Sequence, residues 1–256
     1  MTKTVLITGG TSGIGLSIAH AFAAKGYKLV LNGLEENGKE IASSLAKLYN
    51  TEIVFFDFNL SDAKQAELII QESFKVFNKI DVLVNNAGVQ FVSPIEDFPL
   101  EKWNLILSVN LTSAFILCKG VWNKMKENKF GRIINIASAH GLTASEFKSA
   151  YVASKHGIIG LTKVLALEGA PFGITCNAIC PGYVKTPLVE KQIKDQAKAH
   201  NISEKEVETK IMLAKQPVKE FINIDAISDM CLFLASENAA QVSGSSMSLD
   251  GAWTAQ

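Results

Sequence analysis

The chain has 256 residues, 48% of them apolar, and its 25 basic side chains balance 25 acidic ones. This length and composition are typical of one α/β domain with a sizeable core, so we expect a single domain over residues 1–256. A net charge of zero without a basic block argues against a protein that binds nucleic acid through its phosphates. The first residues enter a strand directly and no apolar run approaches membrane-spanning length, so we expect no membrane partner and a cytoplasmic location.

Apolar runs alternate with longer helical patterns along the whole chain. The runs are continuous rather than alternating, which predicts strands buried on both faces. The predicted strands are residues 4–8, 28–33, 52–57, 81–85, 131–138, 173–180 and 246–251. Helical patterns cover Ser12 to Lys25, with Gly26 as the stop, the turns around Ile41 and Leu45, and a segment that begins near Asp62. This repetition predicts an α/β, Rossmann-like, doubly wound parallel sheet with helices on both faces.

One segment departs from this rhythm. Residues 188–216 are charged, helical in pattern and too long for a simple connection. A solvated surface hairpin fits this composition, but the position directly after a Gly/Pro turn favours a helical lid over the substrate site.

Glycines follow the first predicted strand. Gly9, Gly13 and Gly15 have the spacing G-x-x-x-G-x-G and open the first helix. Such a loop lets backbone N–H groups approach a pyrophosphate at the helix N-terminus. A glycine-rich loop alone is weak evidence, but this location between strand and helix strengthens the prediction of a dinucleotide.

The residues after the second strand bear on the choice of dinucleotide. Leu34, Glu35 and Glu36 stand there, and no basic residue comes before Lys39. Carboxylates repel the 2′-phosphate of NADP, so the sequence favours NAD.

Tyr151 and Lys155 lie four residues apart on a predicted helix and therefore share one face. Taken alone, the pair fits a packed ring beside a solvated lysine. Three motifs occur in order along the chain: the glycine-rich loop, the NNAG stretch (85–88) and this Y-x-x-x-K pair. On these motifs, and over its whole length, the chain resembles the short-chain dehydrogenases/reductases.

The resemblance implies an oxidoreductase with a catalytic tetrad of Asn110, Ser138, Tyr151 and Lys155. Tyr151 is expected to act as the general base, with Lys155 favouring its phenolate and bonding the nicotinamide ribose. Ser138 is expected to hold the substrate oxygen, and Asn110 to bend its helix and hold a water. The other cofactor-binding residues implied by the resemblance are Gly9, Thr11, Ser12, Gly13, Ile14, Gly15, Leu34, Asn59, Leu60, Asn86, Ala87, Gly88, Pro181, Gly182, Val184 and Thr186. Asn59 stands where the family often has Asp.

The substrate side contains several polar candidates. Gln90, His140, Lys148 and Gln192 offer one positive charge and several hydrogen-bond donors, which suit a short carboxylate rather than a long apolar chain. Each alone also fits a surface or loop residue. The stretches 86–99, 138–168, 181–193 and 250–256 resemble family members that act on a short hydroxy acid. This resemblance implies that the four residues bind the carboxylate and that Trp253 closes the pocket. Tyr183 belongs to the same pocket but stands where these members often carry the larger Trp.

Two other functions remain open. An NADPH-dependent reductase of a larger 3-oxoacyl thioester would need a basic residue after the second strand and a more open pocket. A non-catalytic dinucleotide-binding protein would be expected to lose Tyr151, Lys155 or Ser138, and the chain has all three. None of the four cysteines forms a CxxC pair or a cluster with zinc spacing, so we expect no metal and a reducing compartment. The resemblance implies a homotetramer, with the helix that contains Tyr151 in one interface.

Overall fold

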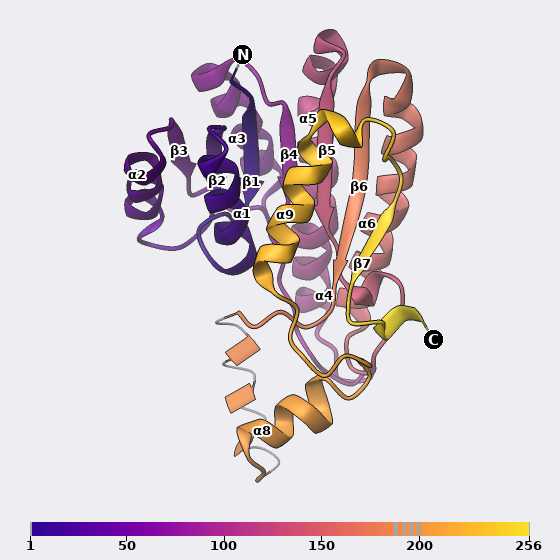
Figure 1. Ribbon diagram of the computed structural model, residues 1–256. Helices are drawn as coiled ribbons and strands as arrows, with labels where there is room; N and C mark the ends of the chain where they lie inside the picture. Colours follow the sequence, from indigo (N-terminus) through magenta and orange to yellow (C-terminus); the bar gives the residue numbers. More distant parts are fainter. Residues whose placement is uncertain (1, 187–188, 191–192, 195–196, 199–200, 256) are drawn as a thin grey trace.

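The computed structural model describes the chain except residues 1, 187–188, 191–192, 195–196, 199–200 and 256 (Figure 1). Its centre is a sheet of seven strands in the order β3-β2-β1-β4-β5-β6-β7, with every neighbouring pair parallel. The strands are β1 (Thr4–Thr8), β2 (Lys28–Asn32), β3 (Ile53–Phe56), β4 (Val82–Asn85), β5 (Gly131–Ile136), β6 (Ile174–Pro181) and β7 (Ser246–Leu249). The predicted α/β class and all seven predicted strands are confirmed.

Helices connect the strands and cover both faces. They are α1 (Gly13–Ala24), α2 (Gly38–Tyr49), α3 (Ala63–Phe77), α4 (Leu100–Leu107), α5 (Ser113–Asn128), α6 (Ser149–Gly169), α8 (Glu204–Glu206) and α9 (Ile224–Ala235). The expected elements do not include α4, α5 or α9. In α5, Phe115 is exposed while Leu117 and Val121 are buried, so apolar residues on opposite sides blur the helical pattern.

Successive residues of each central strand enter opposite cores. Val5 and Ile7 of β1 pack with α1, α2 and α9, whereas Leu6 packs with α3, α5 and α6. The period of two along a strand sends neighbouring side chains to opposite faces. Figure 1 shows α1 and α9 on one face and α5 and α6 on the other. This two-sided burial explains why the strands read as continuous apolar runs.

The helical stretch Leu100–Asn128 is long and apolar enough, by length and composition, to cross a membrane. Its mean hydropathy is 1.6. By length and composition, the expectation that no apolar run approaches membrane-spanning length is therefore wrong. Core helices pass the same test, and Leu117, Val121 and Met125 of this stretch are buried against the sheet. Hydropathy alone therefore does not distinguish this helix from a membrane span.

All four cysteines are free and buried. Burial raises the pKa of the Cys180 thiol to about 11, so it stays protonated at neutral pH. Cys176 and Cys180 both lie in strand β6.

The structure describes helix in the charged segment at 189–190, 193–194, 197–198 and from Glu204 to Met212, with turns or loop at 201–203 and 213–216. It has a small apolar core of Ile193, Val207 and Met212, which packs with Tyr183. Figure 1 shows α8 beyond the carboxyl ends of the strands. A fully solvated hairpin would not bury these side chains. The segment therefore forms part of the wall at the carboxyl ends of the strands, where ligands of such sheets bind.

Candidate active site

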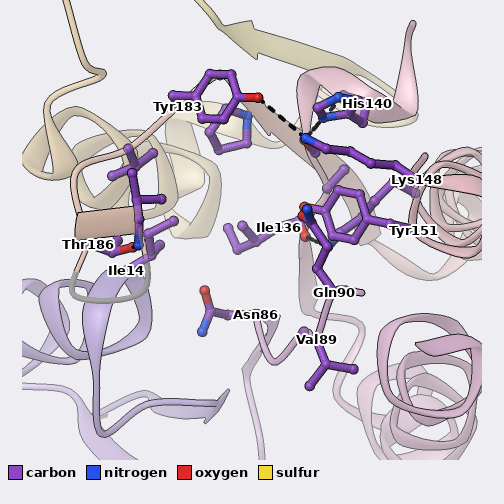
Figure 2. Close-up of a pocket in the computed structure, with 18 residues that line it drawn as sticks. Ile14, Asn86, Val89, Gln90, Ile136, His140, Lys148, Tyr151, Tyr183 and Thr186 are labelled. Atoms are coloured by element: carbon purple, nitrogen blue, oxygen red, sulfur yellow. Dashed lines mark hydrogen bonds between the residues drawn. The ribbon is translucent and has the colours of Figure 1, made fainter. Parts of the chain in front are cut away.

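Three neighbouring cavities lie at the carboxyl ends of the strands, where ligands of such sheets bind. The inner cavity, of about 220 Å³, is lined by Ser138, Tyr151 and Lys155 among others (Figure 2). A larger cavity of about 600 Å³ follows the glycine-rich loop. An outer cavity of about 530 Å³ shares Gln90, Lys148 and Tyr183 with the inner one. Ile14, Asn86, Gly88, Val89 and Thr186 line both the inner and the larger cavity.

The glycine-rich loop is folded so tightly that side chains would not fit. A Cβ on Gly15 would lie 2.0 Å from the carbonyl oxygen of Gly9. Gly9 and Gly13 have φ angles of +59° and +48°, which favour glycine. The Asn86 amide donates to the carbonyl oxygens of Thr8 and Gly9 at 2.9 and 3.2 Å and so ties the loop to the end of β4. The loop leaves a cradle suited to a pyrophosphate.

Most predicted cofactor residues line this part of the site. Those around the larger cavity are Gly9, Ser12, Gly13, Ile14, Leu34, Asn59, Leu60, Asn86, Ala87, Gly88 and Thr186. Pro181, Gly182 and Val184 line the inner cavity instead. Thr11 and Gly15 line neither, because Thr11 is turned to Glu35 and Gly15 packs against Gly9. The sequence analysis missed Asn32 and Phe58 of the larger cavity, which carry no motif. The shared lining of the two cavities and the glycine cradle fit a dinucleotide.

Glu35 lies beside the glycine-rich loop. Its carboxylate accepts hydrogen bonds from the hydroxyls of Ser12, at 2.6 Å, and Thr11. Burial raises the pKa of this carboxyl, but these hydrogen bonds and those of nearby backbone N–H groups outweigh it and the pKa is lowered. The larger cavity therefore carries a fixed negative charge.

Three members of the predicted tetrad meet in the inner cavity: Ser138, Tyr151 and Lys155. Lys155 is only 5% exposed, which excludes a solvated lysine. Its Nζ donates to the carbonyl oxygen of Ile136 at 2.8 Å and lies 5.6 Å from the centre of the Tyr151 ring. Burial lowers the pKa of Lys155 to about 8.

The expected lowering of the Tyr151 pKa by Lys155 is wrong for the chain on its own. Burial raises the pKa of the Tyr151 hydroxyl, and a hydrogen bond from Ser138 offsets this only in part. Desolvation of the phenolate outweighs the effect of the neighbouring hydroxyl.

Asn110 is buried and lines none of the three cavities. It lies in a π-helical turn, Ser108–Thr112, between α4 and α5, where the sequence analysis expects a bend. Its amide oxygen accepts from Val89 N at 2.8 Å, and its amide nitrogen donates to Val89 O at 3.0 Å. Asn110 thus holds the chain that carries Val89 and Gln90 into the site.

Gln90, His140, Lys148 and Tyr183 also line the inner cavity. Lys148 Nζ donates to the Tyr183 hydroxyl at 3.3 Å, and Figure 2 shows the two side chains meeting across the cavity. Trp253 lines the outer cavity, stacks on Tyr183 at 5.7 Å between ring centres and meets the His140 ring edge-on at 5.0 Å. Gln192 lies outside the described residues.

Lys148 and Lys215 place positive charges around His140 at the substrate side of the site. Burial first, and then the positive charges of Lys148 and Lys215, lower the pKa of His140 to about 3, so its ring is neutral at physiological pH. Burial and Lys215 also lower the pKa of Lys148. Lys215 and Ser145 also line the outer cavity and were not predicted, because a lysine in a charged segment and a loop serine give no distinctive signal. Among the described residues, no three His, Cys, Asp or Glu side chains gather as a metal site requires.

Comparisons with known proteins agree with this geometry. The family described as short chain dehydrogenase matches residues 3–197. The D-beta-hydroxybutyrate dehydrogenases of Rhizobium meliloti and Cupriavidus necator are 50% and 45% identical, covering 100% and 99% of this chain and 100% and 98% of theirs. A crystal structure of an actinorhodin polyketide ketoreductase with NADPH superposes with a TM-score of 0.92 at 30% identity, over 100% of this chain and 98% of that one. Proteins of this family bind a nicotinamide dinucleotide, and the chain is an oxidoreductase that belongs to the short-chain dehydrogenase/reductase family.

Proposed function

We propose that the chain oxidises (R)-3-hydroxybutyrate to acetoacetate reversibly, with NAD as its cofactor. The observation that carries this proposal is the inner cavity, where Lys148 and Gln90 face Tyr151 and Ser138 within about 220 Å³. A short hydroxy acid would place its carboxylate at Lys148 and Gln90 and its hydroxyl at Tyr151 and Ser138. The names of the two relatives at 50% and 45% identity point to the same substrate and to its D (that is, R) form.

Each residue has a separate task in this account. Lys148 and Gln90 bind the carboxylate, with His140, Tyr183 and Trp253 forming the wall beside it. Ser138 holds the hydroxyl oxygen of the substrate, and Tyr151 removes its proton as general base. When bound, the oxidised nicotinamide ring supplies the hydride acceptor and a positive charge beside Tyr151. Lys155, kept in place by the carbonyl oxygen of Ile136, faces the space for the nicotinamide ribose. Asn110 keeps the Val89–Gln90 chain in position.

The preference for NAD rests on Glu35. The carboxylate is ionised at neutral pH and occupies the edge of the larger cavity, next to Leu34. A 2′-phosphate would meet this charge, whereas a 2′-hydroxyl can donate to it. No basic side chain among the residues lining the larger cavity compensates for it.

The second candidate is the reductase of a larger 3-oxoacyl thioester with NADPH. It shares the Tyr151 chemistry but would leave the Lys148 charge without a carboxylate. The test is reduction of acetoacetate and of acetoacetyl-CoA, each with NADH and with NADPH. Turnover of acetoacetate with NADH is expected to be about 10–100-fold more efficient than that of the thioester, because one charge-assisted hydrogen bond contributes roughly 1.5–3 kcal/mol. Preference for the thioester with NADPH contradicts the proposal. Cofactor binding without turnover of either substrate favours the non-catalytic alternative.

We also propose a homotetramer in the cytoplasm. The outward face of α6 exposes Val164 and Leu167, the latter 78% exposed, and α5 exposes Phe115. An apolar helix face of this kind is typical of a subunit interface. Light scattering after size exclusion should give four times the monomer mass, and Leu167→Lys should reduce it. The free, buried cysteines fit a reducing compartment.

A further inference from the structure

Both ring nitrogens of His140 face serine hydroxyls. Nδ1 lies 3.5 Å from Ser138 Oγ, and Nε2 lies 3.0 Å from Ser145 Oγ. The ring is 4% exposed and is held edge-on between Trp253, at 5.0 Å, and Tyr151, at 5.9 Å. A neutral imidazole carries one N–H, so one of the two serines must accept from the ring and the other must donate to it.

Ser138 limits this choice because a hydroxyl has one proton. Its Oγ already accepts from the backbone N–H of His140 at 3.1 Å, and it lines the inner cavity together with Tyr151, whose burial-raised pKa a hydrogen bond donated by Ser138 lowers in part. If Ser138 donated to Nδ1, that proton would be lost to Tyr151 and to the substrate oxygen. For the Ser138 proton to stay available to the reacting oxygen, Nδ1 has to donate toward Ser138 and Nε2 has to accept.

We propose that Ser145 is a positioning residue that donates to Nε2 of His140 and thereby holds the ring as the Nδ1–H tautomer. The Nδ1–H group then donates to Ser138, which leaves the Ser138 proton directed at the reacting oxygen. The effect on turnover rests on the proposed function, whereas the tautomer is a property of the chain alone. In this arrangement His140 acts through Ser138, and the charge for the carboxylate comes from Lys148.

Ser145 is well placed for this task. It lies in the loop between the Ala139–Gly141 turn and α6, and the same loop is tied down by Ser93 N, which donates to Phe147 O at 2.9 Å. Ser145 lines the outer cavity and not the inner one, so it does not touch the reacting atoms. Its proposed influence on the reaction therefore passes through His140 and Ser138.

The tautomer is tested directly by NMR of the chain with ¹⁵N-labelled histidine, with His140→Asn to assign the signals. The wild-type ring is expected to show a proton on Nδ1 and none on Nε2. Ser145→Ala is expected to populate the Nε2–H form, and Ser145→Thr to restore the wild-type pattern. A proton on Nε2 in the wild type, or an unchanged pattern in Ser145→Ala, overturns the proposal whether or not the chain oxidises 3-hydroxybutyrate.

Kinetics then test the consequence. Ser145→Ala should lower kcat about tenfold, with the KM for (R)-3-hydroxybutyrate changed by less than about threefold, because only the direction of the Ser138 proton is affected. Ser145→Thr should recover most of kcat, and Thr143→Val, in the same loop, should leave it unchanged. A rise in KM at constant kcat would instead make Ser145 a substrate contact and refute the positioning role. If the wild type gives no turnover of 3-hydroxybutyrate, the proposed function fails and the NMR result alone decides the tautomer.

Discussion

Lys148 Nζ donates a hydrogen bond to the Tyr183 hydroxyl at 3.3 Å, across the cavity that contains Tyr151. The lysine enters from the N-terminal end of α6 and the tyrosine from the end of β6, so this bond links the two walls of the substrate site. An ammonium has three donors, and one bond to Tyr183 leaves two for a carboxylate. In the proposed function, this bond orients the Lys148 ammonium toward the substrate carboxylate.

Tyr183→Phe removes the hydroxyl and keeps the ring that stacks on Trp253. We expect the KM for (R)-3-hydroxybutyrate to rise about 3–10-fold, because Lys148 loses one orienting partner worth roughly 1 kcal/mol, with kcat changed little. Steady-state kinetics at saturating NAD measure both constants. A fall in kcat at unchanged KM would show that Tyr183 acts on the chemical step and not on Lys148.

Lys148→Met removes the charge and keeps most of the apolar stem. The KM for the hydroxy acid should rise about 10–100-fold, since a hydrogen bond to a charged group contributes roughly 1.5–3 kcal/mol, while the KM for NAD stays within about twofold. Lys47→Met, an exposed position on α2 away from the three cavities, is the control and should change neither constant. Parallel changes in both constants would contradict the carboxylate assignment.

Glu35→Gln tests the choice of cofactor. Loss of the negative charge should raise the ratio of kcat/KM for NADP over that for NAD about tenfold, because one repulsive contact disappears. Glu36→Gln, an exposed neighbour, should leave the ratio unchanged. Equal effects of the two substitutions would mean that the general charge of the loop, rather than the carboxylate bonded to Thr11 and Ser12, sets the preference.

The neutral state of His140 has a consequence for stability. Its folded pKa of about 3 lies below the ordinary value of 6.5, so between these values the unfolded chain binds the proton more readily. The free energy of unfolding should therefore fall as the pH drops from 6.5 toward 3, by up to about 1.4 kcal/mol per pH unit from this group. Urea unfolding of wild type and His140→Gln at pH 7 and pH 5 isolates the contribution. An equal loss of stability in both proteins would contradict a buried, neutral His140.

The sequence predicts the sheet well because the central strands are continuous apolar runs that end in polar or glycine-rich loops. The meeting of Tyr151, Lys155 and Ser138 is predicted by the resemblance to the family, and the four-residue spacing alone places only Tyr151 and Lys155 on one helix face. It does not predict α5, whose apolar residues lie on opposite faces, or the hydrogen bond of Lys155 to Ile136. Lys215 could not be found because its segment is distant in sequence from His140 and Lys148. Ser145 is only five residues from His140, but its bond to the ring depends on how the intervening loop folds.

The most direct test of the central claim is the formation of NADH, followed by its absorbance, with purified protein, NAD and each enantiomer of 3-hydroxybutyrate in turn. We expect rapid NADH formation with the R enantiomer, little with the S enantiomer, and none with Tyr151→Phe, which should still bind NAD because only the base is removed. No NADH from either enantiomer, together with turnover of larger 3-hydroxy acids, would contradict the account of the substrate pocket and would make Tyr183 the first residue to change.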